Sequence, residues 1–253
     1  MLEFEEILAV FEPITLAEMD GVVLMDRIDT KYAFNVQKFP LILSYLKDEY
    51  RILEIDNVRS FKYKSVYFDT PDRKMFHDHR VGRPIRFKIR RREYLDSGLN
   101  FMEIKMKNAS GRTRKERIKK GRHEEHLSSD TIDFLEMRCP FKFSQLESAL
   151  VNTFSRLTFV HKKNAERLTI DMCLTFHSHN GAKHEIPYLV IAELKSDSNP
   201  INSFFANLMR TMNIRKYGLS KYCIGTIMVD PDINHNAFMP SLKTIKKIEN
   251  DIC

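Results

Sequence analysis

Basic residues recur at every second position in one stretch of this sequence. Arg86, Lys88, Arg90 and Arg92 are each two residues apart, and Ile89 lies among the residues between them. Because side chains alternate between the two faces of a β-strand, the four cations would share one face. An ammonium group attracts phosphate as a point charge, and a guanidinium group can bind two phosphate oxygens at once. The spacing therefore predicts a surface that binds a substrate with several phosphate groups.

Further stretches show the same alternation of charged and apolar positions. They place together Glu103, Lys105 and Lys107; Thr113, Lys115 and Arg117; Arg27, Asp29 and Lys31; Arg167, Thr169 and Asp171; and Glu193 and Lys195. An ordinary solvated face is the alternative interpretation of each run. Like charges on neighbouring strands are unfavourable, however, and a wet surface normally mixes Lys with Glu. A face this cationic is favourable only against an anion of high charge density.

The charge of the whole chain agrees with an anionic partner but is less specific. The formal net charge is +7 and the pI is near 9.1. Between Arg83 and Arg122 there are fifteen Lys or Arg residues against four acids, so the positive charge is concentrated there. At this level nucleic acid, an anionic membrane surface and a phosphorylated metabolite are all compatible partners.

The cysteines and the termini indicate the compartment. Cys139, Cys173, Cys223 and Cys253 are far apart and form no spacing typical of a zinc knuckle or a disulfide framework. The N-terminus begins with acids, and no apolar run approaches the ~20 residues of a membrane helix. We expect a cytoplasmic protein that meets a membrane only through a membrane-protein partner, which the sequence does not show.

The elements that position these residues follow from the apolar spacing. We expect one domain over residues 1–253, with N-terminal cover helices in 1–23 and a C-terminal tail in 230–253. Helices are predicted at 3–11, 36–50, 130–138, 145–153 and 202–212. Strands are predicted at 61–69, 85–94, 101–107, 113–119, 154–161, 167–176 and 188–195, after an extended segment at 24–34.

About eight strands in mostly antiparallel order favour an α+β fold, namely an antiparallel eight-stranded β-barrel with flanking helices. If the apolar faces pack outward against the helices, the cations face inward and the barrel becomes a tunnel with a polar, basic lumen. Eight strands leave room for side chains or one slender ligand. An unbranched phosphate chain fits such a tunnel, whereas a nucleic-acid duplex does not.

Seven segments, taken together and in order, resemble the VTC domain. This domain is the catalytic module of the vacuolar transporter chaperone polyphosphate polymerase and its bacterial relatives, in the triphosphate tunnel metalloenzyme superfamily. The resemblance runs from about residue 24 to 226. The segments are Arg27-Ile-Asp-Thr-Lys-Tyr32, Tyr67-Phe-Asp-Thr-Pro-Asp72, Arg86-Phe-Lys-Ile-Arg-Arg-Arg-Glu-Tyr94, Phe101-Met-Glu-Ile-Lys105, Arg167-Leu-Thr-Ile-Asp171, Ile191-Ala-Glu-Leu-Lys195 and Ser220-Lys-Tyr222.

The resemblance implies a tunnel that binds a nucleoside triphosphate, most simply ATP, together with inorganic polyphosphate, diphosphate and Mn2+ or Mg2+. No nucleic acid is expected as a partner. The residues implied as catalytic are Lys31, Arg90, Arg92, Lys105 and Glu193, with Glu193 as the metal ligand. The residues expected to bind substrate are Lys88, Lys115, Arg117, Arg156, Arg167, Lys195, Ser220 and Lys221, with Ser220 and Lys221 at one tunnel end.

The implied reaction is transfer of the terminal phosphoryl group of the nucleotide to a growing polyphosphate chain. The chain end is already ionised, so no general base is needed, and positioning and charge neutralisation supply most of the rate. Hydrolytic tunnel enzymes of the CYTH type begin with Glu-x-Glu-x-Lys on the first strand. This chain has Arg27, Asp29 and Lys31 there, which favours the polymerase over a two-metal hydrolase.

Other interpretations stay open at the level of the sequence. A triphosphatase or nucleotide cyclase of the same superfamily is the alternative enzyme, and a non-catalytic polyphosphate-binding module is the alternative without turnover. An RNA-binding face is disfavoured, because the apolar residues between the cations point away from them. For single residues, the alternative to metal binding by Glu193 is an ion pair with Lys195 or Arg90. Asp29 and Glu103 are expected to orient basic residues. Two weak metal candidates, His77 with His79 and His177 with His179, lack a third ligand.

Overall fold

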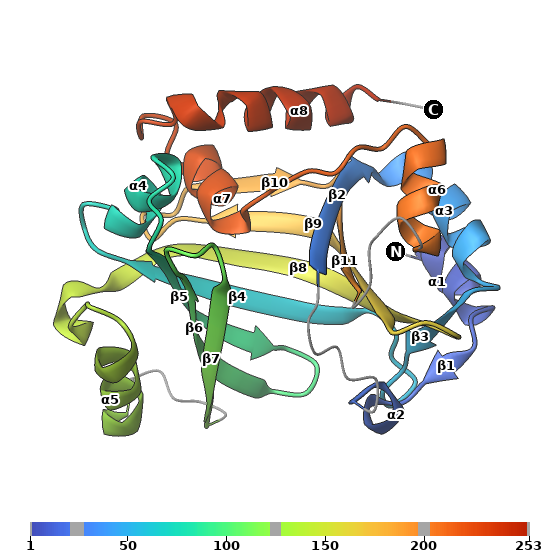
Figure 1. Ribbon diagram of the computed structural model, residues 1–253, viewed down its shortest axis with the longest axis horizontal. Helices are drawn as coiled ribbons and strands as arrows, with labels where there is room; N and C mark the ends of the chain where they lie inside the picture. Colours follow the sequence, from blue (N-terminus) through green and yellow to red (C-terminus); the bar gives the residue numbers. More distant parts are fainter. Residues whose placement is uncertain (1, 21–27, 122–127, 197–202, 252–253) are drawn as a thin grey trace.

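The computed structural model describes residues 2–20, 28–121, 128–196 and 203–251. Arg27, which the sequence places on a charged strand face, lies outside these ranges. Within them, eleven strands form one sheet (Figure 1). The main path runs in the order β2 (Ile28–Asn35), β11 (Leu189–Ser196), β9 (Glu166–His177), β8 (Glu147–His161), β4 (Phe61–Asp69), β5 (Arg86–Tyr94), β6 (Leu99–Lys107) and β7 (Thr113–Lys120). Off this path lie β1 (Pro13–Ile14), β3 (Tyr50–Leu53) and β10 (Lys183–Ile186).

The prediction of a closed eight-stranded barrel was wrong in two respects. The sheet has eleven strands, and over the described residues its end strands β2 and β7 do not pair with each other. Along the main path every neighbouring pair is antiparallel, as expected. Period-2 alternation shows which side chains share a face, but it does not show whether the last strand pairs with the first. Edge strand β7 carries Lys115, Arg117 and Lys119, and such a charged edge disfavours strand-to-strand pairing.

The apolar face of β2, β11, β9 and β8 is covered by α1 (Leu2–Ala9), α3 (Phe39–Leu46) and α6 (Phe204–Thr211), which lie together on the right of Figure 1. In α3 the buried residues are Phe39, Ile42, Leu43 and Leu46, which follow the helical period, and Pro40 sits in the first turn. They pack on alternate strand residues such as Phe159. This packing fixes which face of the strands is apolar and therefore leaves the charged residues on the other face.

The apolar face of β5 and β6 has a second cover. Ile89, Met102 and Ile104 are buried there against Leu135 of α5 (Ser129–Arg138) and against Met75 of α4 (Lys74–Arg80). Strand alternation thus works as predicted, with apolar residues packed against helices and basic residues on the opposite face. We call that opposite face, which carries Lys31, Arg90, Arg156 and Glu193, the basic face.

Two helices near the C-terminus cover one end of the basic face. Helix α7 (Lys221–Val229) and helix α8 (Met239–Glu249) pack on Ala33, Tyr67, Leu150 and Ile191, which are strand residues on that face. In Figure 1 α8 lies above the sheet, with α7 below it beside β10. The remaining short elements are α2 (Leu16–Asp20), η1 (Val36–Lys38), η2 (Phe143–Gln145) and η4 (Asn236–Phe238). Over the described residues, no helix combines the length and the apolar character needed to cross a membrane.

Two sequence predictions of secondary structure differ from the structure. The helix expected at 145–153 is the first half of strand β8. This strand lies between β4 and β9 and is buried on both faces. Leu150 and Phe154 are buried on one face, and Ala149 and Leu157 are buried as well. The sequence therefore lacks the alternation of apolar and polar residues that is typical of a half-buried strand. The tail after residue 230 contains helix α8, whose Ile245 and Ile248 are buried.

Candidate functional site

The strand register brings most of the predicted residues into rows on the basic face. Lys31 lies opposite Glu193, and Glu193 lies opposite Thr169. One row further, Asp29 lies opposite Lys195, which lies opposite Arg167. On the other half of the sheet, Lys88 pairs with Lys105 and Lys105 with Lys115, while Arg90 pairs with Glu103 and Glu103 with Arg117.

The two halves of the sheet face each other. Strands β2 and β6 are not neighbours in the sheet, yet Lys31 contributes to lowering the pKa of Lys105, where burial is the main cause. Burial likewise lowers the pKa of Lys88 to about 8, with contributions from Lys105 and Lys31. Repulsion of this kind requires the cations to be close in space. The sheet is therefore curved enough to bring Lys31 of β2 near Lys88 and Lys105, although β2 and β7 do not pair over the described residues.

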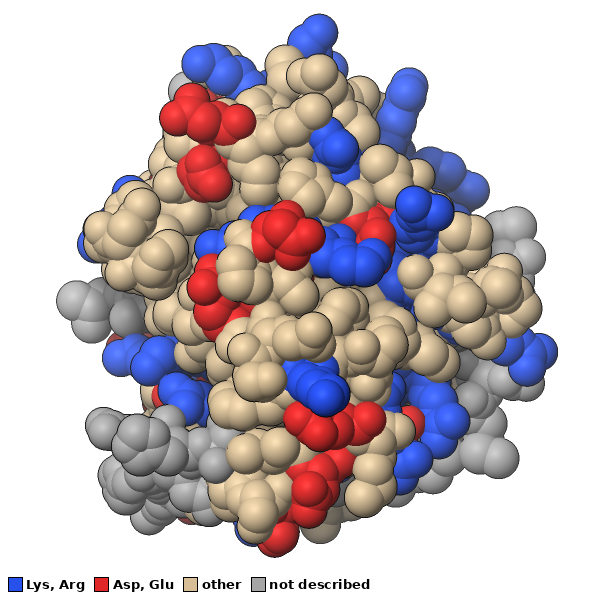
Figure 2. All heavy atoms as spheres, turned by 90° about the vertical axis from the view of Figure 1, so that its left-hand side faces the viewer, with Lys and Arg blue, Asp and Glu red and all other residues tan. Residues whose placement is uncertain are grey.

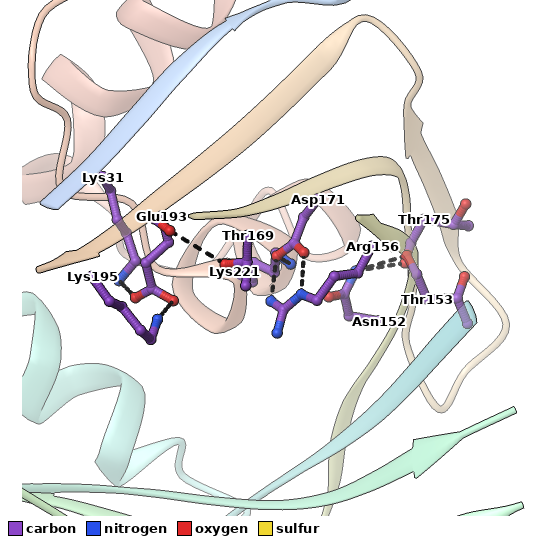
Figure 3. A network of polar contacts seen from close by, with 10 residues as sticks. All are labelled: Lys31, Asn152, Thr153, Arg156, Thr169, Asp171, Thr175, Glu193, Lys195 and Lys221. Carbon is purple, nitrogen blue, oxygen red and sulfur yellow. Dashed lines mark hydrogen bonds and ion pairs between the residues drawn. The ribbon is translucent and has the colours of Figure 1, made fainter. Parts of the chain in front are cut away.

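Glu193 is held by two lysines. Its carboxylate lies 3.4 Å from Lys31 Nζ and 2.5 Å from Lys195 Nζ (Figure 3). Burial alone would raise the pKa of Glu193, but Lys195 and Lys31 outweigh it and keep that pKa well below its usual range. The pair with Lys195 that the sequence left open is thus present, whereas the pair with Arg90 is not.

Asp171 is held in the same way by residues from two different elements. Arg156 Nε donates to Oδ1 at 2.5 Å and Nη2 donates to Oδ2 at 2.7 Å, and Lys221 Nζ donates to Oδ2. Figure 3 shows the three side chains pointing toward one another between strands and helix α7. Because both oxygens of this buried carboxylate accept from cations, its pKa lies far below the ordinary value, against the effect of burial.

Glu103 is the third such carboxylate. Arg90 donates to Oε2 from Nε at 2.8 Å and from Nη2 at 2.6 Å, and Lys115 Nζ lies 2.5 Å from Oε1. Glu103 is only 2% exposed, and Arg90, Arg92 and Lys115 lower its pKa to about 2 although burial would raise it. The prediction that Glu103 orients basic residues is in agreement with this geometry.

Other cations on the basic face have no such compensation. Among the described residues no carboxylate pairs with Arg92, which is 8% exposed and whose Nε has no hydrogen-bond partner. Burial, Arg90 and Arg156 lower the pKa of Arg92 to about 10. Lys88 and Lys105 also lack an ion pair with any described carboxylate, and Lys88 Nζ instead donates to Ser220 Oγ at 2.9 Å. Figure 2 shows that basic and acidic side chains are mixed on the side of the molecule that lies at the left of Figure 1.

The N-terminus of α7 presents Ser220 and Lys221 to the basic face. Ser220 Oγ caps the helix by accepting from Cys223 N at 3.3 Å, and it also accepts from Lys88. Behind it, the Tyr222 hydroxyl donates to buried Asp69, whose carboxylate also accepts from the backbone N–H of Met75 at 2.9 Å. The sequence predicts the end of a strand at Asp69, and it predicts no helix after residue 220.

Aromatic side chains share the basic face, contrary to the expectation that apolar residues there point away from the cations. Tyr63 stacks on Phe154 at 5.3 Å between ring centroids, and the guanidinium groups of Arg156 and Arg92 lie 5.2 and 5.6 Å from the Tyr63 ring. Tyr63 and Phe154 are buried, so they support the arginines instead of offering an open stacking surface. Arg117 lies over Phe101 at 4.7 Å. Tyr94 packs between the rings of Tyr63 and Phe101.

The described residues contain no group of three or more His, Cys, Asp or Glu side chains that could hold a metal ion. Mg2+ and similar ions are, however, often bound by one or two carboxylates together with substrate phosphates. Glu193 fits that mode, since it is a carboxylate on the basic face that is 20% exposed. Within the part of the chain that the structure describes, the pairs His77 with His79 and His177 with His179 gain no third ligand.

The comparisons with known proteins agree with this geometry. The family model of the VTC domain matches residues 26–229. The chain belongs to the VTC domain family. Membership confirms the resemblance, and the VTC match begins and ends close to the predicted limits. No curated protein matches the chain.

Solved structures similar to this VTC domain share its fold. One is a putative adenylyl cyclase from Hippeastrum with a dominant triphosphatase activity; the TM-score is 0.51 and the identity 11%, over 84% of this chain and 100% of that one. Another is a putative adenylate cyclase from Bacillus halodurans, with a TM-score of 0.50 and 17% identity over 78% of this chain and 96% of that one. At these identities the likeness concerns the fold alone.

Proposed function

We propose that this VTC domain is a polyphosphate polymerase that transfers the terminal phosphoryl group of a nucleoside triphosphate to the end of a polyphosphate chain on the basic face. In this reaction a terminal oxygen of the chain forms a bond to the γ-phosphorus, the bond from that phosphorus to the β-phosphate oxygen breaks, and the nucleoside diphosphate leaves. ATP is the simplest donor.

The observation that carries the proposal is the uncompensated charge on an enclosed face. Arg92, Lys88 and Lys105 have no carboxylate partner among the described residues, and Arg92 is buried. A buried cation without a counter-ion is costly, whereas phosphate oxygens would pair with it. Membership of the VTC domain family supports polyphosphate as this polyanion, because the resemblance described above is to polyphosphate polymerases.

The residues divide into roles by type. Arg90, Arg92, Arg156 and Arg167 would grip the triphosphate, since guanidinium groups bind oxygens in pairs. The lysines Lys31, Lys105, Lys115 and Lys195 would act as point charges on the transferred group and the leaving diphosphate. The remaining substrate contacts in the proposal come from Lys88, Arg117, Ser220 and Lys221. No side chain is asked to abstract a proton, because the attacking phosphate is already ionised.

Glu193 is the proposed ligand for Mn2+ or Mg2+. A divalent ion there would neutralise charge on phosphate oxygens. The protein supplies the carboxylate, and Lys31 and Lys195 fix its position at 3.4 and 2.5 Å.

The test is incubation with ATP and Mn2+ or Mg2+, followed by separate measurement of long-chain polyphosphate and of free phosphate. We expect polymer together with an equal amount of ADP counted per phosphate added. Free phosphate without polymer would instead support a triphosphatase, the second candidate, which the fold shared with the Hippeastrum protein favours. Binding of tripolyphosphate without either product would indicate a non-catalytic polyphosphate-binding module.

A matched binding experiment separates the polyanion classes. Tripolyphosphate should displace a labelled phosphate chain at lower concentration than an oligonucleotide of equal charge does. A preference for the oligonucleotide would contradict the proposal that no nucleic acid is bound.

A further inference from the structure

The N-terminus of α7 connects two parts of the sheet that are not neighbours. Lys221, the first residue of the helix, donates to Asp171 on β9, and Ser220 accepts from Lys88 on β5 at 2.9 Å. Between β9 and β5 lie strands β8 and β4. These two polar contacts therefore fix the helix end across the basic face, in the region where Arg92 and Arg156 lie beside Tyr63.

Asp171 already accepts three hydrogen bonds in this connection. It is buried, Arg156 occupies both of its oxygens, and Lys221 shares Oδ2. A carboxylate in this position cannot bind a phosphate, because like charges repel. Its contacts can, however, set the place and the protonation state of two cations that come from different elements.

The charge around Lys221 makes such help necessary. Burial is the largest influence on its ammonium group and lowers its pKa to about 7, with Arg156 and Arg92 acting in the same direction and Asp171 acting against them. Besides these, Lys221 Nζ lies 3.4 Å from the centre of the Phe154 ring. The charged and titratable groups of the elements packed around this helix end are Asp171 on β9, Arg156 on β8, Arg92 and Lys88 on β5, Tyr63 and Asp69 on β4, and Tyr222 and Cys223 on α7 itself.

We infer that Asp171 is a positioning residue of the phosphate site, which holds Lys221 of α7 and Arg156 of β8 in place and keeps Lys221 charged for binding a phosphate group. The inference rests on the proposed function, since it assigns a partner to residues of the same site. Asp171 does not touch the substrate. It acts through the two cations that do.

The sign of the effect follows from the contacts. Removing the negative charge with Asp171→Asn removes the main influence that favours protonated Lys221, so its pKa falls further. An opposite charge at contact distance changes a pKa by roughly one to three units. Lys221 would then be mostly neutral at neutral pH and would regain its proton only in more acidic solution.

The experiment is calorimetric binding of tripolyphosphate to the whole chain between pH 5.5 and about 9, with the fold of each variant checked by near-UV circular dichroism. For Asp171→Asn we expect at least tenfold weaker binding at neutral pH, and an alkaline loss of affinity that begins about one or more pH units lower than in the wild type. In a Lys221→Met background the same substitution should cause no such displacement. Glu166→Gln is the matched control. Glu166 is a buried carboxylate on the same strand, but it lies on the opposite face of the sheet and accepts from Tyr50. The pH profile of tripolyphosphate binding to this variant should equal that of the wild type.

The outcomes separate the two levels of the proposal. If the wild-type chain does not bind tripolyphosphate, the proposed function fails and takes this inference with it. If the wild type binds and Asp171→Asn weakens binding equally at every pH, or strengthens it, the positioning role is wrong and the proposed function stands. Should Asp171→Asn not fold, Asp171→Glu replaces it: we expect an unchanged alkaline limb with at least tenfold weaker binding, and wild-type affinity would overturn the role.

Discussion

Arg92 offers the sharpest test of whether the basic face is built for an anion, because its removal should change stability and binding in opposite directions. Burial, together with repulsion from Arg90 and Arg156, lowers its pKa from the ordinary value of an arginine to about 10. At about 1.4 kcal/mol per pKa unit, this difference corresponds to roughly 3 kcal/mol by which the charge disfavours the folded state. Both states carry the proton at neutral pH, so the full penalty applies there and is relieved only as the pH rises through about 10.

Replacing Arg92 with Met keeps much of the side-chain volume and removes the charge. Part of the gain is offset by the lost contact with Tyr63 at 5.6 Å, which is worth about 0.5–2 kcal/mol. We therefore expect the free energy of unfolding of the ligand-free protein to rise by about 1–2 kcal/mol, or a melting temperature higher by about 2–8 °C. Binding of tripolyphosphate should weaken by about 10- to 100-fold, because a charged hydrogen bond contributes about 1.5–3 kcal/mol.

Arg90→Met is the matched control on the same strand and face. It leaves Glu103, which is 2% exposed, with Lys115 as its remaining partner, and breaking a buried pair in this way costs about 3–5 kcal/mol. Thermal unfolding with and without tripolyphosphate measures both effects in one series. If Arg92→Met destabilises the ligand-free protein as much as Arg90→Met does, Arg92 is a structural cation and the reasoning is refuted.

Three further results are expected. Tripolyphosphate affinity should fall from pH 7 to 9, because Lys88, with its pKa of about 8, and Lys221, with its pKa of about 7, lose their protons. The stability of the ligand-free protein should rise over the same interval. A binding profile that is flat by calorimetry would contradict this. Gly225→Ala should weaken tripolyphosphate binding at least tenfold and lower the free energy of unfolding by about 1–3 kcal/mol. The added Cβ would lie 2.3 Å from Phe176 Cδ1 and would displace α7. Wild-type affinity would show that the position of α7 does not matter for binding. Glu193→Gln should abolish the response of polymer synthesis to added Mn2+ or Mg2+ while metal-free tripolyphosphate binding persists, and an unchanged metal titration would exclude Glu193 as the ligand.

The strand faces could be predicted from the sequence because alternation is a local property. Arg86, Lys88, Arg90 and Arg92 share a face for the same geometric reason in any sheet. The packing of Ile89 against α5 and α4 confirms that the opposite face is the apolar one. The pairing of Lys31 with Glu193 also follows once both strands are aligned. Alternation does not show which strand, if any, pairs with each edge strand of the sheet. For this reason the prediction of a closed barrel was wrong.

Helix α7 could not be predicted for a different reason. Tyr222, Cys223, Ile224 and Ile227 are all buried, so the helix has no polar stripe from which a period could be recognised. The role of Asp171 was hidden for a related reason, since its two partners lie 15 and 50 residues away in the chain. A carboxylate in a basic row could be a metal ligand, a solvated charge or an anchor for cations, and only the positions of Arg156 and Lys221 distinguish these.

Three paired carboxylates, two of them buried, explain how so basic a face can fold and still bind an anion. Glu193, Asp171 and Glu103 each accept from two cations, so each offsets half of the charge that it organises. Full compensation would give a more stable ligand-free protein, but a phosphate chain would then have to break ion pairs in order to bind. With half compensation the cations are held in place and a net positive charge persists, to which Arg92 adds its own unpaired charge. A polyphosphate chain then supplies the missing negative charge, and the stability that the fold gives up without ligand returns as binding free energy.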